Sequence, residues 1–163
     1  MSTDTDMLPR DPAQRARDVR ARLVSDMDLW VASADADGRP YLVPLSFLWN
    51  GDAVWVVTRL SNPTGRNLAA GGLTRLAFGT TRDVVLVDGE AVAYTQDDVP
   101  APVAEGFRDK TGWDARAAGP AYRWFRIRPA TVEAWHEYPE FPDRRLMTDG
   151  VWVGGAAEDV RQR

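Results

Sequence analysis

The sequence predicts a mainly β domain of the α+β class, built around an antiparallel barrel. Its 163 residues, of which 44% are hydrophobic, suffice for one domain with a sizeable core. Short runs rich in Val, Leu, Trp and Tyr begin at Leu29 and recur along the chain. Turn signals separate them: Asp-Ala-Asp-Gly at 35–38, Asn-Gly-Asp at 50–52 and Asp-Gly at 88–89. Strands this numerous and closely spaced are typical of an antiparallel barrel.

A helix is expected before the first strand, at about 12–25. Asp11 can cap its N-terminus, Pro12 suits the first helical position, and Ala16, Val19 and Leu23 share one helical face. Strands are predicted at 29–34, 40–49, 53–58, 75–80, 84–94, 122–129 and 132–136, with a weaker one at 150–153. Helices are predicted at 64–70, before a pair of glycines, and at about 99–110.

These elements form a single domain without an internal repeat. We expect a flexible N-terminus at 1–11, one domain at 12–155 and a C-terminal tail at 156–163. The N-terminal segment has no apolar stretch of the signal-peptide kind, and no segment is long enough to span a membrane. The expected location is therefore the cytoplasm.

The charge of the chain limits its partners. A formal net charge of −4 and a pI near 5.0 argue against general binding to nucleic acid or to an anionic membrane, since either needs a dense basic surface. The absence of cysteine excludes disulfides and thiolate metal sites. His136 is the single histidine, and one histidine without clustered ligands is a weak metal signal, so no metal site is expected.

The segment 44–67 is the strongest candidate for a binding site. Ser61, Thr64 and Arg66 surround the start of the predicted helix at 64–70, where free N–H groups, hydroxyls and a guanidinium can hold a phosphate. Pro44 interrupts an apolar strand, which places it at a strand edge or bulge. Such an edge leaves backbone N–H and C=O groups free to contact a flat heterocycle.

Several segments, in this order, resemble the pyridoxamine 5′-phosphate oxidase-like split-barrel family, including its FMN-binding and deazaflavin (coenzyme F-420) branches. They are Trp-Val-Ala-Ser at 30–33, Asp-Gly-Arg-Pro at 37–40, Val-Pro-Leu-Ser-Phe at 43–47, Asn-Gly at 50–51, Trp-Val-Val-Thr at 55–58 and Arg-Asn-Leu at 66–68. The resemblance extends from about residue 12 to about residue 155. It implies a six-stranded split β-barrel with Greek-key character and a few peripheral helices.

The resemblance also implies a homodimer with a cofactor, FMN or the deazaflavin, in each groove between the subunits. The residues that it implies for the phosphate are Thr58, Thr64 and Arg66, and Ser61 and Asn67 are further candidates from the same loop and helix start. The residues that it implies for the isoalloxazine ring, largely through their backbone, are Val43, Pro44, Leu45 and Ser46. Trp135, and also Trp113, are candidates for the dimer groove, and Arg144 and Arg145 are weaker candidates for a cofactor tail in the other subunit.

One departure from the family concerns the second strand. Pyridoxamine-phosphate oxidases carry a basic residue on each side of its apolar core, whereas this chain has no basic residue between Arg39 and Arg59. Pyridoxamine phosphate is therefore not the expected substrate. The expected function is an oxidoreductase that transfers a hydride to or from a small organic substrate, with no side chain nominated as catalytic. A non-catalytic carrier of flavin, deazaflavin or haem, or an interaction domain without a cofactor, are the alternatives.

Overall fold

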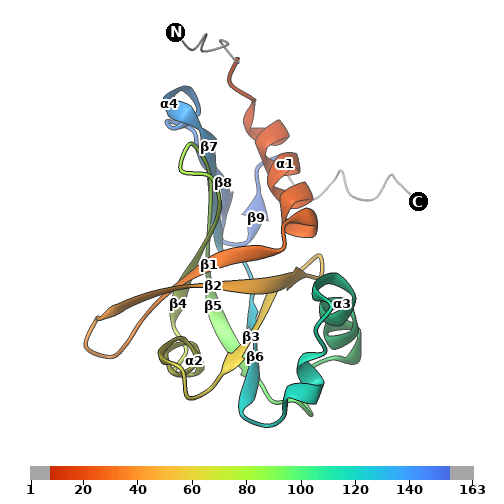
Figure 1. The fold of residues 1–163 in the computed structure, drawn as a ribbon. Helices are drawn as coiled ribbons and strands as arrows, with labels where there is room; N and C mark the ends of the chain where they lie inside the picture. The colour runs from red at the N-terminus through yellow and green to blue at the C-terminus, as the bar shows by residue number, and fades with distance from the viewer. Residues whose placement is uncertain (1–7, 155–163) are drawn as a thin grey trace, which may run out of the picture.

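The computed structural model describes residues 8–154. Its elements follow the predicted order of helices and strands, with three short additions (Figure 1). They are α1 (Pro12–Ser25), β1 (Asp28–Ala34), β2 (Pro40–Trp49), β3 (Val54–Arg59), α2 (Pro63–Ala69), β4 (Leu73–Gly79), β5 (Asp83–Tyr94), α3 (Ala101–Thr111), η1 (Ala115–Ala118), β6 (Tyr122–Ile127), β7 (Thr131–His136), α4 (Glu137–Glu140), β8 (Arg145–Thr148) and β9 (Val151–Trp152).

Six antiparallel strands close the barrel in the order β4-β1-β2-β3-β6-β5, and β4 pairs back onto β5. The long strand β5 belongs to two structures. Its first half, Asp83 to Asp88, pairs with β7, and its last residues, Ala91 to Tyr94, pair with β6. Strands β7, β8 and β9 therefore extend the sheet beyond the barrel. The predicted split barrel is confirmed.

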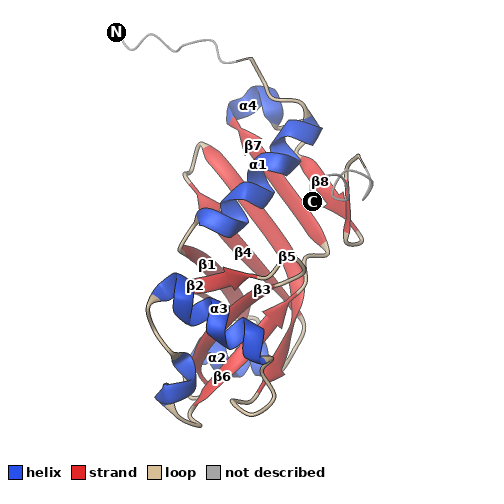
Figure 2. Ribbon diagram, turned by 90° about the vertical axis from the view of Figure 1, so that its right-hand side faces the viewer, coloured by secondary structure: helices blue, strands red, loops and turns tan. Residues whose placement is uncertain are grey.

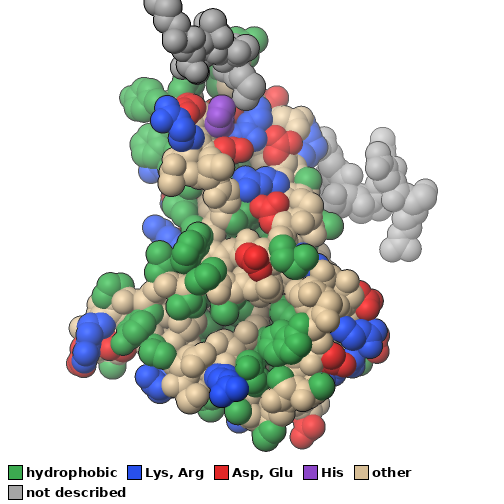
Figure 3. Space-filling model, in the orientation of Figure 1, with side chains coloured by type: hydrophobic (Ala, Val, Ile, Leu, Met, Phe, Trp, Pro, Cys, Tyr) green, Lys and Arg blue, Asp and Glu red, His purple; other side chains and the backbone are tan. Residues whose placement is uncertain are grey.

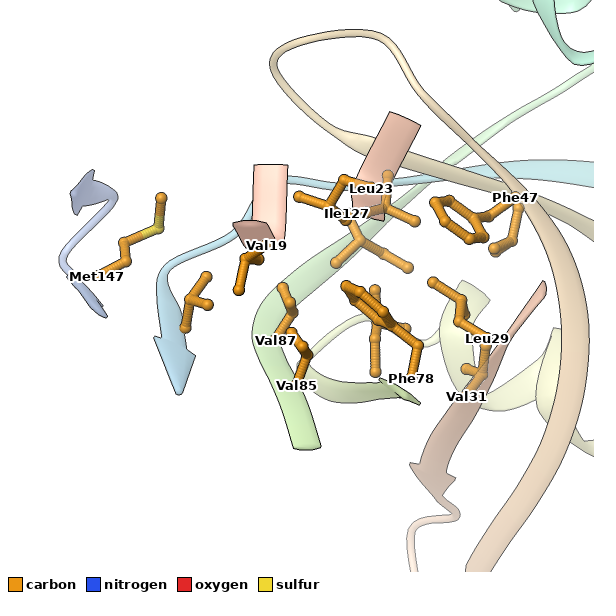
Figure 4. Close-up of a cluster of buried hydrophobic side chains, with 14 of the residues drawn as sticks. Val19, Leu23, Leu29, Val31, Phe47, Phe78, Val85, Val87, Ile127 and Met147 are labelled. Carbon is orange, nitrogen blue, oxygen red and sulfur yellow. The ribbon is translucent and has the colours of Figure 1, made fainter. Parts of the chain in front are cut away.

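Two apolar cores hold the layers together. The larger core fills the barrel and continues under α1, whose Val19 and Leu23 pack with Phe47 and Ile127 (Figure 4). The smaller core lies outside the barrel, where Phe107 of α3 covers the outer face of β3 and β6 (Figure 2). Burial of these side chains on both sides of β3 leaves its last residues fixed at the edge of a pocket described below.

A buried ionic cluster fastens the N-terminal segment to the connection between β7 and β8. Glu140 is 2% exposed, and its carboxylate accepts hydrogen bonds from the backbone N–H and side chain of Arg10 and from the N–H of His136. Arg15, 1% exposed, donates to the carbonyl oxygens of Ala134 and Glu140. Arg10 lies within the range predicted to be flexible, of which residues 1–7 lie outside the described residues.

The structure adds elements that the sequence pattern did not predict: η1, α4 and β8. The connection 137–145 contains two prolines and several charged residues, which favour a loop by composition. In β8 only the adjacent residues Leu146 and Met147 are buried. The strand therefore lacks the alternation of apolar and polar residues by which a strand is predicted. Strand β4 begins at Leu73, two residues before the predicted 75–80. The predicted tail at 156–163 lies outside the described residues.

Candidate functional site

The site begins where β2 and β3 separate. β2 pairs with β1 from Pro40 to Ser46, but with β3 only from Phe47 to Trp49. β3 continues along β6 as far as Arg59. Pro44, Leu45 and Ser46 on one side, and the last residues of β3 on the other, therefore flank an opening in the barrel wall. Strand edges without a ladder partner present free backbone hydrogen-bonding groups.

A pocket of about 610 Å³ occupies this opening, which is within the usual range for small-molecule sites. Residues from β2, β3, the loop before α2, α3, the turn after α3 and the start of β6 line it. These residues are Pro44, Leu45, Ser46, Val57, Thr58, Arg59, Asn62, Phe107, Trp113 and Tyr122. The structure therefore brings together three residues predicted for the ring and one, Thr58, predicted for the phosphate.

The loop between β3 and α2 is held close to the end of β3. Thr58 is 6% exposed, and its hydroxyl accepts a hydrogen bond from the Asn62 side chain at 3.3 Å. Gly65 lies so near the strand that a Cβ atom there would be 2.1 Å from the carbonyl oxygen of Arg59. Only glycine allows this approach of α2 to β3. The close approach fixes the floor of the pocket beside Thr58.

The other predicted phosphate residues surround this loop but do not line the pocket in one chain. The Arg66 guanidinium is exposed and donates to the backbone carbonyl of Ser61, itself exposed. Thr64 is buried, and the Asn67 amide donates to the Ser33 hydroxyl at 3.1 Å. Since α2 has only seven residues, its dipole is small, so these side chains and free N–H groups would carry most of an anion's binding.

Two further predicted residues lie elsewhere. The side chain of Val43 packs against the barrel core, opposite Val31 on β1, so a ligand in the opening could meet only its backbone. Trp135 lies on β7 beside Phe141, with the two ring centroids 5.3 Å apart. β7 and the neighbouring α4 form the end of the molecule away from α2 and α3 (Figure 1).

Sequence reasoning missed one wall of the pocket. Phe107, within α3, was not considered, Trp113, just after α3, was expected only in the dimer groove, and Tyr122 was placed at a strand start. Arg59 was also missed, although it directly follows Thr58. The alternation of side chains along β3 could have indicated Arg59, because Val57 and Arg59 point to the same side of the strand.

The pocket carries a positive charge. No carboxylate is found among the described residues that line it, and Arg59 is the one lining residue with a permanent charge. Arg59 Nε donates to the Tyr122 hydroxyl at 3.2 Å, and this hydrogen bond raises the pKa of Arg59. Within residues 8–154, no group of three or more His, Asp or Glu side chains is placed to hold a metal ion. No helix in the same range is long and apolar enough to cross a membrane.

Comparison of the fold with solved structures finds proteins of the same architecture. HutZ, the haem storage protein from Vibrio cholerae, is 17% identical, with a TM-score of 0.64 over 73% of this chain and 93% of that one. PhzG from Burkholderia lata, solved with tetrahydrophenazine-1-carboxylic acid, is 18% identical, with a TM-score of 0.56 over 92% and 93%. A haem-binding protein from Mycobacterium smegmatis is 17% identical, with a TM-score of 0.57 over 81% and 57%.

A search of curated proteins found no match to this chain. The sequence model of the pyridoxamine 5′-phosphate oxidase family, however, matches residues 18–136. This range contains the whole barrel, both edges of the opening and the wall formed by Phe107, Trp113 and Tyr122. Because the match covers more than half of the chain and the fold agrees with it, the chain belongs to the pyridoxamine 5′-phosphate oxidase family.

Proposed function

We propose that this protein is an oxidoreductase that binds a flavin-type cofactor, FMN or a deazaflavin, without a covalent bond. The observation that carries this proposal is the opening between β2 and β3, which combines two unpaired backbone edges with a lining that contains no carboxylate among the described residues. A flavin ring needs backbone donors and acceptors along its polar edge more than charged side chains. The residues present fit such a ring.

The ring would lie along Pro44, Leu45 and Ser46 and contact Val43 through its backbone. The phosphate would lie beside Thr58 and Asn62, at the start of α2. Arg66 would turn from the Ser61 carbonyl to the phosphate, since its guanidinium is exposed and can rotate. The Thr64 hydroxyl and the Asn67 amide, which lie in the same segment, would help to hold this loop in position.

The bound cofactor would supply two-electron chemistry by accepting or donating a hydride. The chain's own groups would bind and orient the reactants, because effective catalysis of hydride transfer depends on the distance and alignment of the two reacting atoms. Tyr122 is the one phenol among the described lining residues, and its hydroxyl carries an exchangeable proton.

We also propose that the protein is a homodimer, formed through the outer face of β1, β2, β4 and β5. Pro44, Trp30, Ala77 and Leu86 lie side by side on this face by strand register. Trp30 is 47% exposed, and hydrophobic side chains reach the surface over β1 and β2 in Figure 3. Exposed apolar patches of this kind favour association. We expect twice the chain mass by sedimentation at micromolar concentration, and a monomer would contradict this part.

The dimer would also bring a residue into the site. Pro44 belongs both to this face and to the pocket, so a partner on the face would border the cofactor. Trp135 points to the same side of the sheet as Leu86. Glu133 is paired with Leu86, and Trp135 lies two residues further along β7, so strand alternation directs both to that side. We therefore propose that Trp135 reaches the groove from the partner subunit.

Haem carriage is the second candidate, because the two haem-binding proteins named above share this fold. The single histidine, His136, would be the natural protein ligand for haem iron. It lies at the end of β7, points to the opposite side of the sheet from Trp135, and does not line the pocket of its own chain. This position favours the flavin proposal, which needs no histidine.

Titration of the purified protein with FMN, with deazaflavin and with haemin, followed by visible absorbance, tests these proposals. We expect one flavin-type cofactor per chain. Arg66→Ala should weaken its binding by about 1.5–3 kcal/mol, roughly 10- to 150-fold, the range for a lost hydrogen bond to a charged group. Arg108→Ala, at an exposed arginine of α3, should leave affinity unchanged.

Two results would count against the proposal. Failure of both flavin-type cofactors to bind would remove it, and unchanged affinity in a folded Arg66→Ala variant would remove Arg66 from the site. A reduced cofactor that binds but is not reoxidised by any of a panel of quinones, enones and nitroaromatics would favour a carrier over an enzyme.

A further inference from the structure

The pocket has a second wall, opposite β2, that the cofactor as placed above does not use. Three aromatic rings form it, and each meets the next edge to face. The Phe107 and Trp113 centroids are 6.2 Å apart at 67°, and the Trp113 and Tyr122 centroids are 5.5 Å apart at 68°. Phe107 is anchored in turn on the buried Trp124, 5.3 Å away. We call Phe107, Trp113 and Tyr122 the aromatic wall.

The chain around Trp113 is held in place by its own hydrogen bonds. Gly112 ends α3 in the left-handed conformation, with φ of +77°. The Thr111 hydroxyl then donates to the carbonyl of Phe107 at 2.8 Å and accepts from the N–H of Trp113 at 3.2 Å. The turn therefore aims Trp113 at the pocket instead of leaving it as a free surface side chain.

The segment after Trp113 is fastened as well. The Gln96 side chain donates to the carbonyls of Ala115 and Gly119, at 2.9 and 3.1 Å, and accepts from the indole N–H of Trp124 at 2.9 Å. One amide thus ties η1 and the following turn to the end of β5. An ordered wall loses little conformational entropy when a ligand binds to it.

Trp113 is nevertheless 40% exposed, although it stands in a pocket and is held from behind. An aromatic ring held in this way presents a face on which another ring can stack. The pocket of about 610 Å³ is open along this face.

Arg59 adds a charge at the rim of the wall. Its guanidinium carbon lies 5.3 Å from the centroid of the Tyr122 ring, and its Nε is engaged by the Tyr122 hydroxyl. Its other two guanidinium nitrogens have no acceptor among the described residues. A planar guanidinium that is oriented by one ring and has free N–H groups matches one carboxylate.

From these contacts we infer that the aromatic wall and Arg59 form a subsite for a planar aromatic carboxylate, which stacks on Trp113 and pairs with Arg59. The inference deepens the proposed function, on which it rests for the role of this ligand as the substrate beside the cofactor ring. A single aromatic carboxylate is the class favoured, because one cation and no carboxylate are found among the described lining residues.

The test uses 2-naphthoate as the probe, with 2-naphthylmethanol as its uncharged analogue and cyclohexanecarboxylate as its non-planar one. Binding is measured by tryptophan fluorescence and calorimetry, on the purified protein and on the cofactor-loaded protein. We expect 2-naphthoate to bind at least tenfold more tightly than either analogue. Trp113→Leu and Arg59→Gln should each weaken it at least tenfold, whereas Trp113→Phe should retain most of the affinity.

The controls separate this subsite from the cofactor site. Arg108→Gln, on the exposed side of α3, should bind 2-naphthoate as the natural chain does. Trp113→Leu and Arg59→Gln should keep cofactor affinity within about twofold, a smaller change than removal of any charged contact would cause. Unfolding curves of both variants show whether the fold is intact.

Three outcomes would overturn the inference. One is equal binding of the charged and uncharged naphthyl compounds. Another is no binding of 2-naphthoate at millimolar concentration to the natural chain. The third is an Arg59→Gln variant that loses cofactor and retains 2-naphthoate, which would assign Arg59 to the phosphate. Failure of the cofactor itself to bind is a separate result, because binding of 2-naphthoate to the purified protein does not depend on it.

Discussion

Glu140→Ala should lower the free energy of unfolding by about 3–5 kcal/mol, the usual cost of removing one partner from a buried ion pair. The Glu140 carboxylate holds Arg10 through both of its oxygens, at 2.8 to 3.0 Å, and lies 3.9 Å from the Nε of the buried Arg15. Without it, Arg15 keeps Asp143 as its remaining carboxylate partner. Urea denaturation of the two proteins measures the difference.

Glu137→Ala is the matched control, because Glu137 lies on the same short helix and pairs with Arg82 at the surface. Exposed pairs contribute about 0–1 kcal/mol. We expect Glu137→Ala to change stability by less than about 1 kcal/mol. Similar losses in both variants would mean that the buried cluster does not secure the N-terminal segment.

The same carboxylate predicts how stability depends on pH. Burial raises the pKa of Glu140, but hydrogen bonds from Arg10 and from the N–H of His136 lower it more, to about 2. The carboxylate therefore binds its proton less readily in the folded chain than in the unfolded chain, where its pKa is near 4.5. Its contribution is complete above about pH 5 and is lost as the pH falls toward 2. Glu140→Gln should flatten this part of the stability profile, and an unchanged profile would contradict the assignment.

Gly65→Ala should weaken cofactor binding at least tenfold and lower the free energy of unfolding by about 1–3 kcal/mol, the usual cost of overpacking. The new methyl group would lie 2.1 Å from the carbonyl oxygen of Arg59, which is backbone and cannot rotate away. Helix α2 must then move from β3, and with it Asn62, which bonds to Thr58. Calorimetric titration with the cofactor, together with urea denaturation, measures both effects.

Gly106→Ala provides the comparison for a helical glycine without such a contact. Its new methyl group would lie 3.3 Å from a methyl carbon of the Leu48 side chain, which can shift. Alanine is also the better helix former by about 1 kcal/mol. We expect this variant to keep cofactor affinity and stability, so a loss equal to that of Gly65→Ala would reject the steric explanation.

The sequence predicted the barrel well because its strands alternate and its turns carry strong local signals. The hairpin at 50–52 and the helix after 62 follow from residues that act on their own neighbours. The β7–β8 connection was missed for the opposite reason. Its conformation depends on contacts of Glu140 and Asp143 with Arg10 and Arg15, which are more than a hundred residues away in the sequence. No local sequence pattern predicts such contacts.

The candidate site also contains residues that local sequence patterns predict and residues whose placement depends on distant contacts. Pro44 marked the edge of β2 because proline cannot donate to a ladder, and the structure places the opening there. Arg66 is predicted to bind the phosphate because it lies in a loop of hydroxyl residues, and this stays a prediction; the pocket of the single chain is lined by Arg59, which was not predicted. Which of two nearby arginines enters a pocket depends on how α2 packs on β3, through Gly65, and on the position of Tyr122 across the sheet.

A crystal structure of the protein with FMN or the deazaflavin bound tests the central claim most directly. We expect the ring between Pro44–Ser46 and the end of β3, the phosphate beside Thr58 and Asn62, and a second copy covering the outer face of β1 and β2. A cofactor bound at another place, with the opening between β2 and β3 empty, would contradict this account.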